Sequence, residues 1–325
     1  MRLSDISRLM KSQRHLATAG ALLLMPATLR ASTDTQQNAA VHNTVPTAIA
    51  PDESLHVTIE GTGEPVILIP GLVGSAFGYR RLRADLVAAG FQAVVIEPLG
   101  IGGSPRPERA NYSLTSQADR IGATMERLHL ENAIVVAHAV GASMALRLSY
   151  RFPGRVRALV SLDGGPAERA ATPGFRRAMR FAPFVKLFGG VKLVRRKLRE
   201  ELISQSGDTS WVTEAVVDGY TAGHARDLDG TLKAYIRMAD ARDREALAPN
   251  LARVRIPVRL LIGLAEHSGV PSHDEIQLLA SRLPDFSVSR VAGTGHFLYE
   301  ERPDLVLAAV VALARSGPGL VTSDK

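Results

Sequence analysis

From Leu55 onward, short apolar runs alternate with longer amphipathic segments. The run Val66-Ile67-Leu68-Ile69 is apolar at every position, which is typical of a strand buried on both faces in a parallel sheet. The same pattern recurs at 93–96, 133–136, 158–162 and 258–262, and 286–291 is a further predicted strand. Residues 55–60 instead alternate apolar and polar side chains and stop at Gly61, which predicts an edge strand.

Helical periodicity fills the intervals between these strands, at about 77–89, 115–129, 141–152, 273–283 and 303–314. Regular alternation of strands and helices predicts the α/β class: a mostly parallel, doubly wound sheet with helices on both faces. Ligands of such sheets bind beyond the carboxyl ends of the strands. The loops at those ends therefore hold the candidate chemistry.

The interval from Leu162 to Val258 contains no strand pattern. Its predicted helices cover about 173–188, 191–205, 210–221 and 229–239, so we expect a helical lid over residues 166–244. Its aromatic residues either line the underside of the lid or only pack its helices together; they are Phe175, Phe181, Phe184, Phe188 and Trp211.

The N-terminal segment has the layout of a secretory signal peptide over residues 1–31. A basic start precedes a mostly apolar stretch from Leu16 to Leu29, and Ala31 offers a small residue before a cleavage point. We therefore expect export to the periplasm or medium, with a cytoplasmic protein as the alternative. Residues 32–52 are predicted to be a disordered linker. The α/β core is expected over 53–165 and 245–316, with a tail at 317–325.

The composition excludes several kinds of site and locates the net charge of the chain. The 325 residues include no cysteine, which excludes disulfides, thiolate metal sites and a cysteine nucleophile. Ten Lys/Arg and three Glu between Glu168 and Glu201 account for the whole formal net charge of +7. This basic segment is either a solvated helix face or a surface that attracts an anionic substrate or a membrane. No nucleic-acid-binding motif accompanies the charge, so nucleic acid is not an expected partner.

Four predicted loops at strand ends carry the candidate site. One is the turn Pro70-Gly71-Leu72-Val73-Gly74-Ser75, and a second runs from Glu97 to Ser104. The third, Ala137-His138-Ala139-Val140-Gly141, lies at a strand-to-helix junction and reads as a G-x-S-x-G nucleophile elbow whose central serine is replaced by Ala139. The fourth, Gly293-Thr294-Gly295-His296, follows the last strand.

These loops, in this order, give the chain a resemblance to the α/β-hydrolase fold family over about residues 55–315. The resemblance implies a lid between the sixth and seventh strands of the family order. It implies that His296 is the catalytic base, that Ala139 occupies the nucleophile position, and that the backbone N–H groups of Leu72 and Val140 form the oxyanion hole.

The catalytic acid is less well defined. The family usually places it after the strand ending at Ile262, and there the count back from Pro271 reaches His267, with Glu266 beside it. An imidazole cannot orient a catalytic histidine as a carboxylate does. Asp163, at the end of the preceding strand, is the favoured acid, and Glu266 is the alternative.

Three functions remain open. The first is a serine-type hydrolase of carboxylic esters or lactones whose present form is inactive or strongly impaired because Ala139 has no hydroxyl. The second is a pseudoenzyme that binds an apolar small molecule or a partner. The third is a catalyst that uses His296 in non-covalent acid–base chemistry. No metal or organic cofactor is expected, since the sequence has no phosphate loop, no dinucleotide fingerprint and no pair of histidines at ligand spacing.

Overall fold

The computed structural model describes residues 41–46, 53–171, 173–179 and 189–316, all within the structural unit Thr35–Lys325. The expected leader, the tail and the residues Phe181, Phe184 and Phe188 lie outside the described residues. Within those ranges, no helix is long and apolar enough to cross a membrane.

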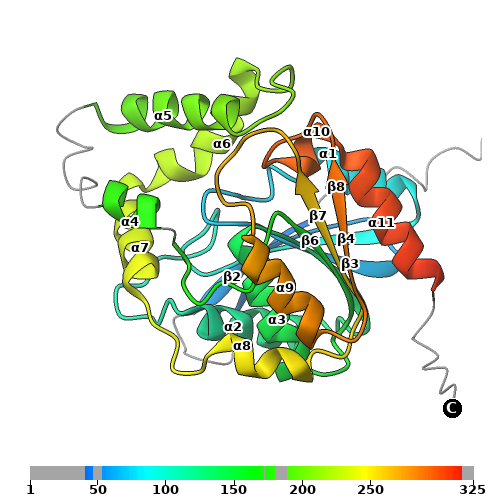
Figure 1. The fold of residues 1–325 in the computed structure, drawn as a ribbon. Helices are drawn as coiled ribbons and strands as arrows, with labels where there is room; N and C mark the ends of the chain where they lie inside the picture. The colour runs from blue at the N-terminus through cyan, green and yellow to red at the C-terminus, as the bar shows by residue number, and fades with distance from the viewer. Residues whose placement is uncertain (1–40, 47–52, 172, 180–188, 317–325) are drawn as a thin grey trace, which may run out of the picture. The chain divides into compact units, whose positions relative to one another are not determined.

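The described strands form one sheet in the order β1-β2-β4-β3-β5-β6-β7-β8 (Figure 1). All neighbours from β4 to β8 are parallel, whereas β1 and β2 are antiparallel to their neighbours. This confirms the mostly parallel α/β sheet. The strands are β1 (Val41–Pro46), β2 (Ser54–Glu60), β3 (Glu64–Ile69), β4 (Phe91–Glu97), β5 (Ala133–His138), β6 (Val156–Leu162), β7 (Val258–Gly263) and β8 (Phe286–Val291).

Strand β1 corrects two expectations. It lies inside the predicted linker 32–52, and it pairs with β2 so that Val45 faces Leu55, which means that β2 is not an edge strand. The polar composition of residues 32–52 indicates that these residues form no hydrophobic core of their own, but it does not exclude a strand that pairs with an existing sheet. An open strand edge, however, offers unpaired backbone N–H and C=O groups that a polar segment can pair with.

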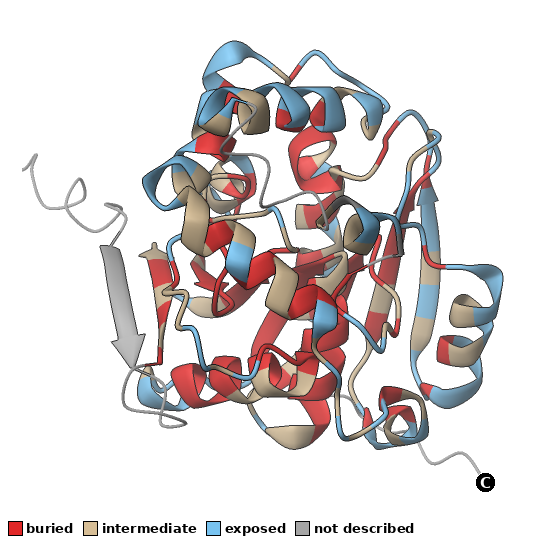
Figure 2. Cartoon of the chain, turned by 90° about the vertical axis from the view of Figure 1, so that its left-hand side faces the viewer, coloured by how far each residue is buried: buried red, intermediate tan, exposed pale blue. Residues whose placement is uncertain are grey.

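Helices cover both faces of the sheet (Figure 1). Helices α2, α3 and α9 pack in one hydrophobic cluster, and α1 and α11 in the other. Figure 2 shows the buried residues concentrated between these layers. The helices are α1 (Arg80–Ala88), α2 (Leu114–Arg127), α3 (Val140–Arg151), α4 (Pro173–Met179), α5 (Gly190–Ser204), α6 (Glu214–Arg226), α7 (Leu228–Asp240), α8 (Leu247–Asn250), the 3-10 turn η2 (Leu251–Arg253), α9 (His273–Arg282), α10 (Leu298–Glu301) and α11 (Pro303–Arg315).

Helices α4 to α7 form the helical insertion between β6 and β7. Trp211 is buried in a cluster made mainly by α5 and α6, and its ring centroid is 5.6 Å from that of Phe297. Phe175 of α4 packs edge-on against Tyr235 of α7. Phe175 thus packs helices of the insertion together, whereas Trp211 also packs the insertion against Phe297, the residue after His296.

Part of the basic charge in this insertion is paired within it. Arg195 of α5 contacts Glu214 at 2.6 Å and Asp218 at 2.7 Å, both on α6, and Arg199 contacts Glu214 at 3.2 Å. These contacts favour the interpretation of a solvated helix face crossed by ion pairs.

The strand order determines where a ligand site forms. The chain passes from β3 outward to β4 and then returns to β5 on the other side of β3. Such a reversal leaves a crevice beyond the carboxyl ends of the two central strands. The glycine turn after β3 and the elbow after β5 flank this crevice, and the loops after β6, β7 and β8 follow along the same edge of the sheet.

Candidate active site

Ala139 lies between the end of β5 and the start of α3, with φ 49° and ψ −122°. A residue with a β-carbon rarely adopts this backbone conformation, which costs about 1–3 kcal/mol. Alanine has no polar side-chain atom that could gain a hydrogen bond in return. The surrounding structure therefore imposes the conformation.

Close backbone packing explains how. A β-carbon on Gly141 would lie 2.8 Å from the carbonyl oxygen of Ile69 in β3. One on Gly164, in the loop after β6, would collide with the Ala139 carbonyl oxygen and with Ala142. The elbow is thus held between the ends of β3 and β6, at contacts that only glycine allows.

The glycine turn after β3 faces the elbow. A β-carbon on Gly71 would lie 3.4 Å from the Ala139 β-carbon, and the turn closes with a hydrogen bond from Gly74 N to Gly71 O. Leu72 is partly buried here. Helix α3 starts without a side-chain cap, so the N–H of Val140 lies in a helical turn that has no intrahelical acceptor.

Buried Glu97 connects the two glycine-rich turns. Its carboxylate accepts hydrogen bonds from Ala76 N and Gly103 N, each at 2.6 Å, and contacts His56 Nδ1 at 3.0 Å. Sequence reasoning did not single out this carboxylate, because a buried acid beside glycines has no distinctive spacing.

His296 is positioned by its backbone. Its N–H donates to Gln205 O at 2.7 Å, and its carbonyl accepts from His138 Nε2 at 3.0 Å. Nearby, the buried carboxylate of Glu301 accepts from the N–H groups of Gly207, Asp208 and Gly295. The loop carrying His296 is thereby joined both to β5 and to the segment between α5 and α6.

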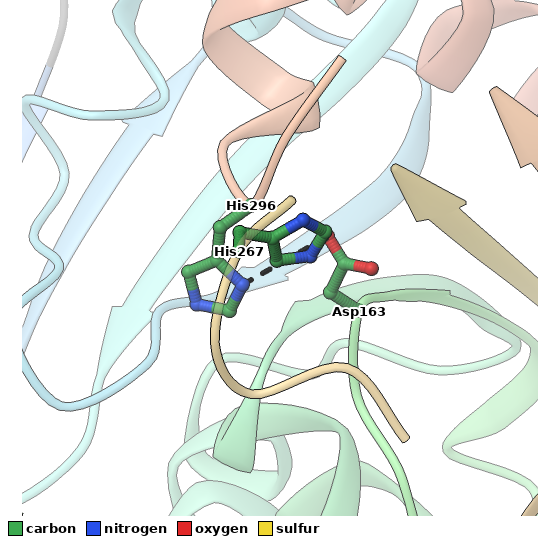
Figure 3. A group of neighbouring side chains, drawn as sticks. All are labelled: Asp163, His267 and His296. Carbon is green, nitrogen blue, oxygen red and sulfur yellow. Dashed lines mark ion pairs between the residues drawn. The ribbon is translucent and has the colours of Figure 1, made fainter. Parts of the chain in front are cut away.

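Two imidazoles, those of His267 and His296, lie on the same side of the Asp163 carboxylate (Figure 3). Its Oδ2 is 3.3 Å from His267 Nε2 and 3.8 Å from His296 Nδ1. Its Oδ1 accepts from Gly263 N at 3.3 Å. The side chains of Asp163 and His267 are fully buried, and that of His296 is 16% exposed.

Burial is the largest influence on the pKa values of these histidines and of Asp163. It lowers the pKa of His296 well below the usual value, and the rings of His138 and His267 lower it further. Burial also lowers the pKa of His138, to about 4, and raises that of Asp163 despite the contact with His267. Burial opposes a charge on His267 too, but the Asp163 carboxylate outweighs it and raises the pKa of His267. His296 and His138 are thus neutral near pH 7.

The structure therefore brings His296 and Asp163 together, with Ala139 and the turn at Leu72 facing each other beside them. Glu266, the alternative acid, is not among the residues that contact His296. His267 occupies the expected acid position but contributes an imidazole beside Asp163. The count from Pro271 located this residue, and only the fold shows which carboxylate it contacts.

Comparisons with known proteins agree with this architecture. The family described as alpha/beta hydrolase fold matches residues 64–303. A putative carbamate hydrolase, RutD, from Azorhizobium caulinodans is 28% identical over 80% of this chain and 95% of its own. Haloalkane dehalogenase 2 from Mycobacterium bovis is 26% identical over 79% and 90%. Among solved structures, the epoxide hydrolase CorEH superposes with a TM-score of 0.71 at 20% identity, over 85% of this chain and 99% of its own.

Proposed function

The chain belongs to the alpha/beta hydrolase fold family, and we propose that its site is that of a serine-type hydrolase whose nucleophile has been lost at Ala139. Curated relatives are named as hydrolases of small molecules, among them a putative carbamate hydrolase. In a form carrying serine at position 139, the reaction is hydrolysis of a carboxylic ester or lactone through an acyl-enzyme. The present chain is inactive or strongly impaired in that reaction.

One observation carries this proposal: Ala139 keeps φ 49° and ψ −122° at the strand-to-helix junction. That strained turn is of use to a nucleophile, because it lifts the side chain out of the helix toward the substrate. An alanine in this conformation is what remains when the hydroxyl is lost and the surrounding glycine contacts are kept.

The roles follow from this geometry. The hydroxyl introduced by Ala139→Ser would attack the ester carbonyl while Nε2 of His296 takes its proton, and the same imidazole would later activate water. Asp163, next to Nδ1, would hold the ring in the tautomer that leaves Nε2 free to accept. The N–H groups of Leu72 and Val140 would stabilise the oxyanion.

Restoring the serine tests the proposal. Ala139→Ser is expected to raise hydrolysis of short p-nitrophenyl esters by about a thousandfold or more, since loss of such a nucleophile costs about a millionfold in a serine protease. A fluorophosphonate should label this variant and leave the parent chain unlabelled. The matched control is Ala139→Ser with His296→Gln, which keeps the hydroxyl but removes the base. A variant that gains no turnover and takes up no label contradicts the proposal.

A second candidate is a non-catalytic binder of an apolar small molecule or a partner. The distance of 3.8 Å between His296 Nδ1 and Asp163 Oδ2 favours it, because this is longer than a hydrogen bond. Such a protein should bind its ligand equally well after His296→Ala. A turnover by the parent chain that His296→Ala abolishes would instead support the third candidate, non-covalent acid–base catalysis.

Export is a separate proposal that rests on the layout of residues 1–31. Expression of the full chain in a bacterium, followed by N-terminal sequencing of the periplasmic protein, tests it. A start near Ser32 supports export, and an intact Met1 in the cytoplasm contradicts it.

A further inference from the structure

Three buried side-chain atoms face one another: Asp163 Oδ2, His267 Nε2 and His296 Nδ1. All lie within 4.8 Å of one another. They come from the loops after β6, β7 and β8, and Figure 3 shows the two imidazoles turned toward the same carboxylate. Asp163 Oδ2 and His267 Nε2 form an ion pair at 3.3 Å, whereas His296 Nδ1, at 3.8 Å from Oδ2, has no hydrogen-bond partner. A buried polar atom without a partner costs about 1–3 kcal/mol, so its place beside this pair needs an explanation.

Hydrogen bonds to the backbone determine which atoms of His267 and Asp163 face the centre of this cluster. His267 Nδ1 lies 2.7 Å from the Ala265 carbonyl, which can only accept, so Nδ1 carries the proton. Nε2 faces the Asp163 Oδ2 atom at 3.3 Å, and a metal ion bound there would displace the proton held between these two atoms. The Gly263 N–H occupies Oδ1 of Asp163 and leaves Oδ2 directed at the imidazoles. Metal-binding histidines and carboxylates are oriented by outer contacts of this kind.

We propose that Asp163, His267 and His296 form a binding site for one divalent first-row transition-metal ion, with Zn²⁺ as its representative. Two imidazoles and one carboxylate are a donor set that suits zinc and iron(II), whereas calcium and magnesium prefer oxygen ligands alone. Ligand atoms around a four-coordinate zinc lie about 3.3 Å apart. The His267–Asp163 separation of 3.3 Å meets this spacing, and the His296–Asp163 separation of 3.8 Å is close to it.

The loop after β7 is the route by which an ion would reach His296. Residues Ser268, Gly269 and Val270 are exposed in the loop after β7. A β-carbon on Gly269 would lie 3.4 Å from His296 Cε1 and 3.9 Å from Nδ1, so no side chain at this position covers that edge of the buried imidazole. The ion would use the same Nδ1 and Oδ2 atoms as a hydrolase triad, so the two uses of this pair exclude each other.

The test measures metal binding directly, with tag-free full-length protein and no substrate. We expect one Co²⁺ per chain, seen by its visible absorption bands, and displacement of that Co²⁺ by Zn²⁺. His267→Gln and Asp163→Asn should each weaken binding by at least about 100-fold, since even the loss of an outer contact costs about 10- to 100-fold.

The matched control is His224→Gln, which removes a buried histidine whose Nδ1 and Nε2 lie 3.0 Å from Tyr220 O and Tyr235 Oη. It should bind the ion like the parent chain. Circular dichroism identifies any variant that fails to fold, and His267→Gln provides the test if Asp163→Asn does so. Two results would overturn the proposal. If no stoichiometric binding is seen, a proton occupies the position beside Asp163 Oδ2 that we assign to the ion. If binding survives His267→Gln, the ion lies at another site. Because no turnover is measured, this outcome is independent of the Ala139→Ser experiment.

Discussion

Ala139 and Asp163 each follow a central strand and each have a positive φ, at 49° and 48°. The two residues differ in what their side chains contact. At Ala139 the strained backbone carries only a methyl group. At Asp163 the side chain is a carboxylate, and it faces an extra imidazole. The comparison teaches that backbone packing can impose a strained turn on a residue without a polar side chain, because Gly141 and Gly164 pack closely against the end of β3 and the elbow itself.

The largest effect should come from disturbing that packing. Gly164→Ala is expected to destabilise the fold by about 3 kcal/mol, because its β-carbon would collide with Ala142 and with the Ala139 carbonyl. Gly223→Ala in α6 is the control, since the nearest atom to its β-carbon would be 3.7 Å away and alanine favours the helix by about 1 kcal/mol. Urea unfolding midpoints measure both. Equal stability of the two variants would show that the elbow is not held by this contact.

A smaller effect is expected when Zn²⁺ binds beside a restored nucleophile. In the Ala139→Ser variant, Zn²⁺ at about ten times its dissociation constant should lower ester hydrolysis by about tenfold, because the ion would occupy the Nδ1 and Oδ2 atoms through which Asp163 orients His296. Removal of the ion with EDTA should restore the rate. Inhibition that persists after His267→Gln would place the inhibitory ion elsewhere.

The smallest effect should come from relieving the strain itself. Ala139→Gly is expected to stabilise the fold by about 1 kcal/mol, since glycine adopts a positive φ at little cost. Ala142→Gly, in the first turn of α3, should destabilise it by a similar amount because its backbone is helical. Thermal unfolding of both proteins compares them, and a loss of stability in both would mean that the elbow is unstrained.

Most of the sheet could be predicted from the sequence, because fully apolar runs such as 66–69 are typical of strands with both faces buried. The bounds of α9 were predicted to within one residue because a local signal marks its start, the capping box of Ser272 and Glu275. Helix α6, in contrast, starts at Glu214, four residues after the predicted start at 210. Strand β1 was missed, since its place depends on the open edge of β2 and not on its own side chains.

The sequence by itself determined the order of the glycine turns, the alanine at the centre of the predicted elbow and the candidate base His296, because these are local patterns at strand ends. Only the tertiary structure decided that Asp163 contacts both His267 and His296, since the three residues come from separate loops whose meeting depends on strand order. Tertiary packing also decided that Ala139 stays strained. Contacts from Gly141 and Gly164 fix that backbone, and neither contact is visible in the chain until β3, β5 and β6 lie side by side.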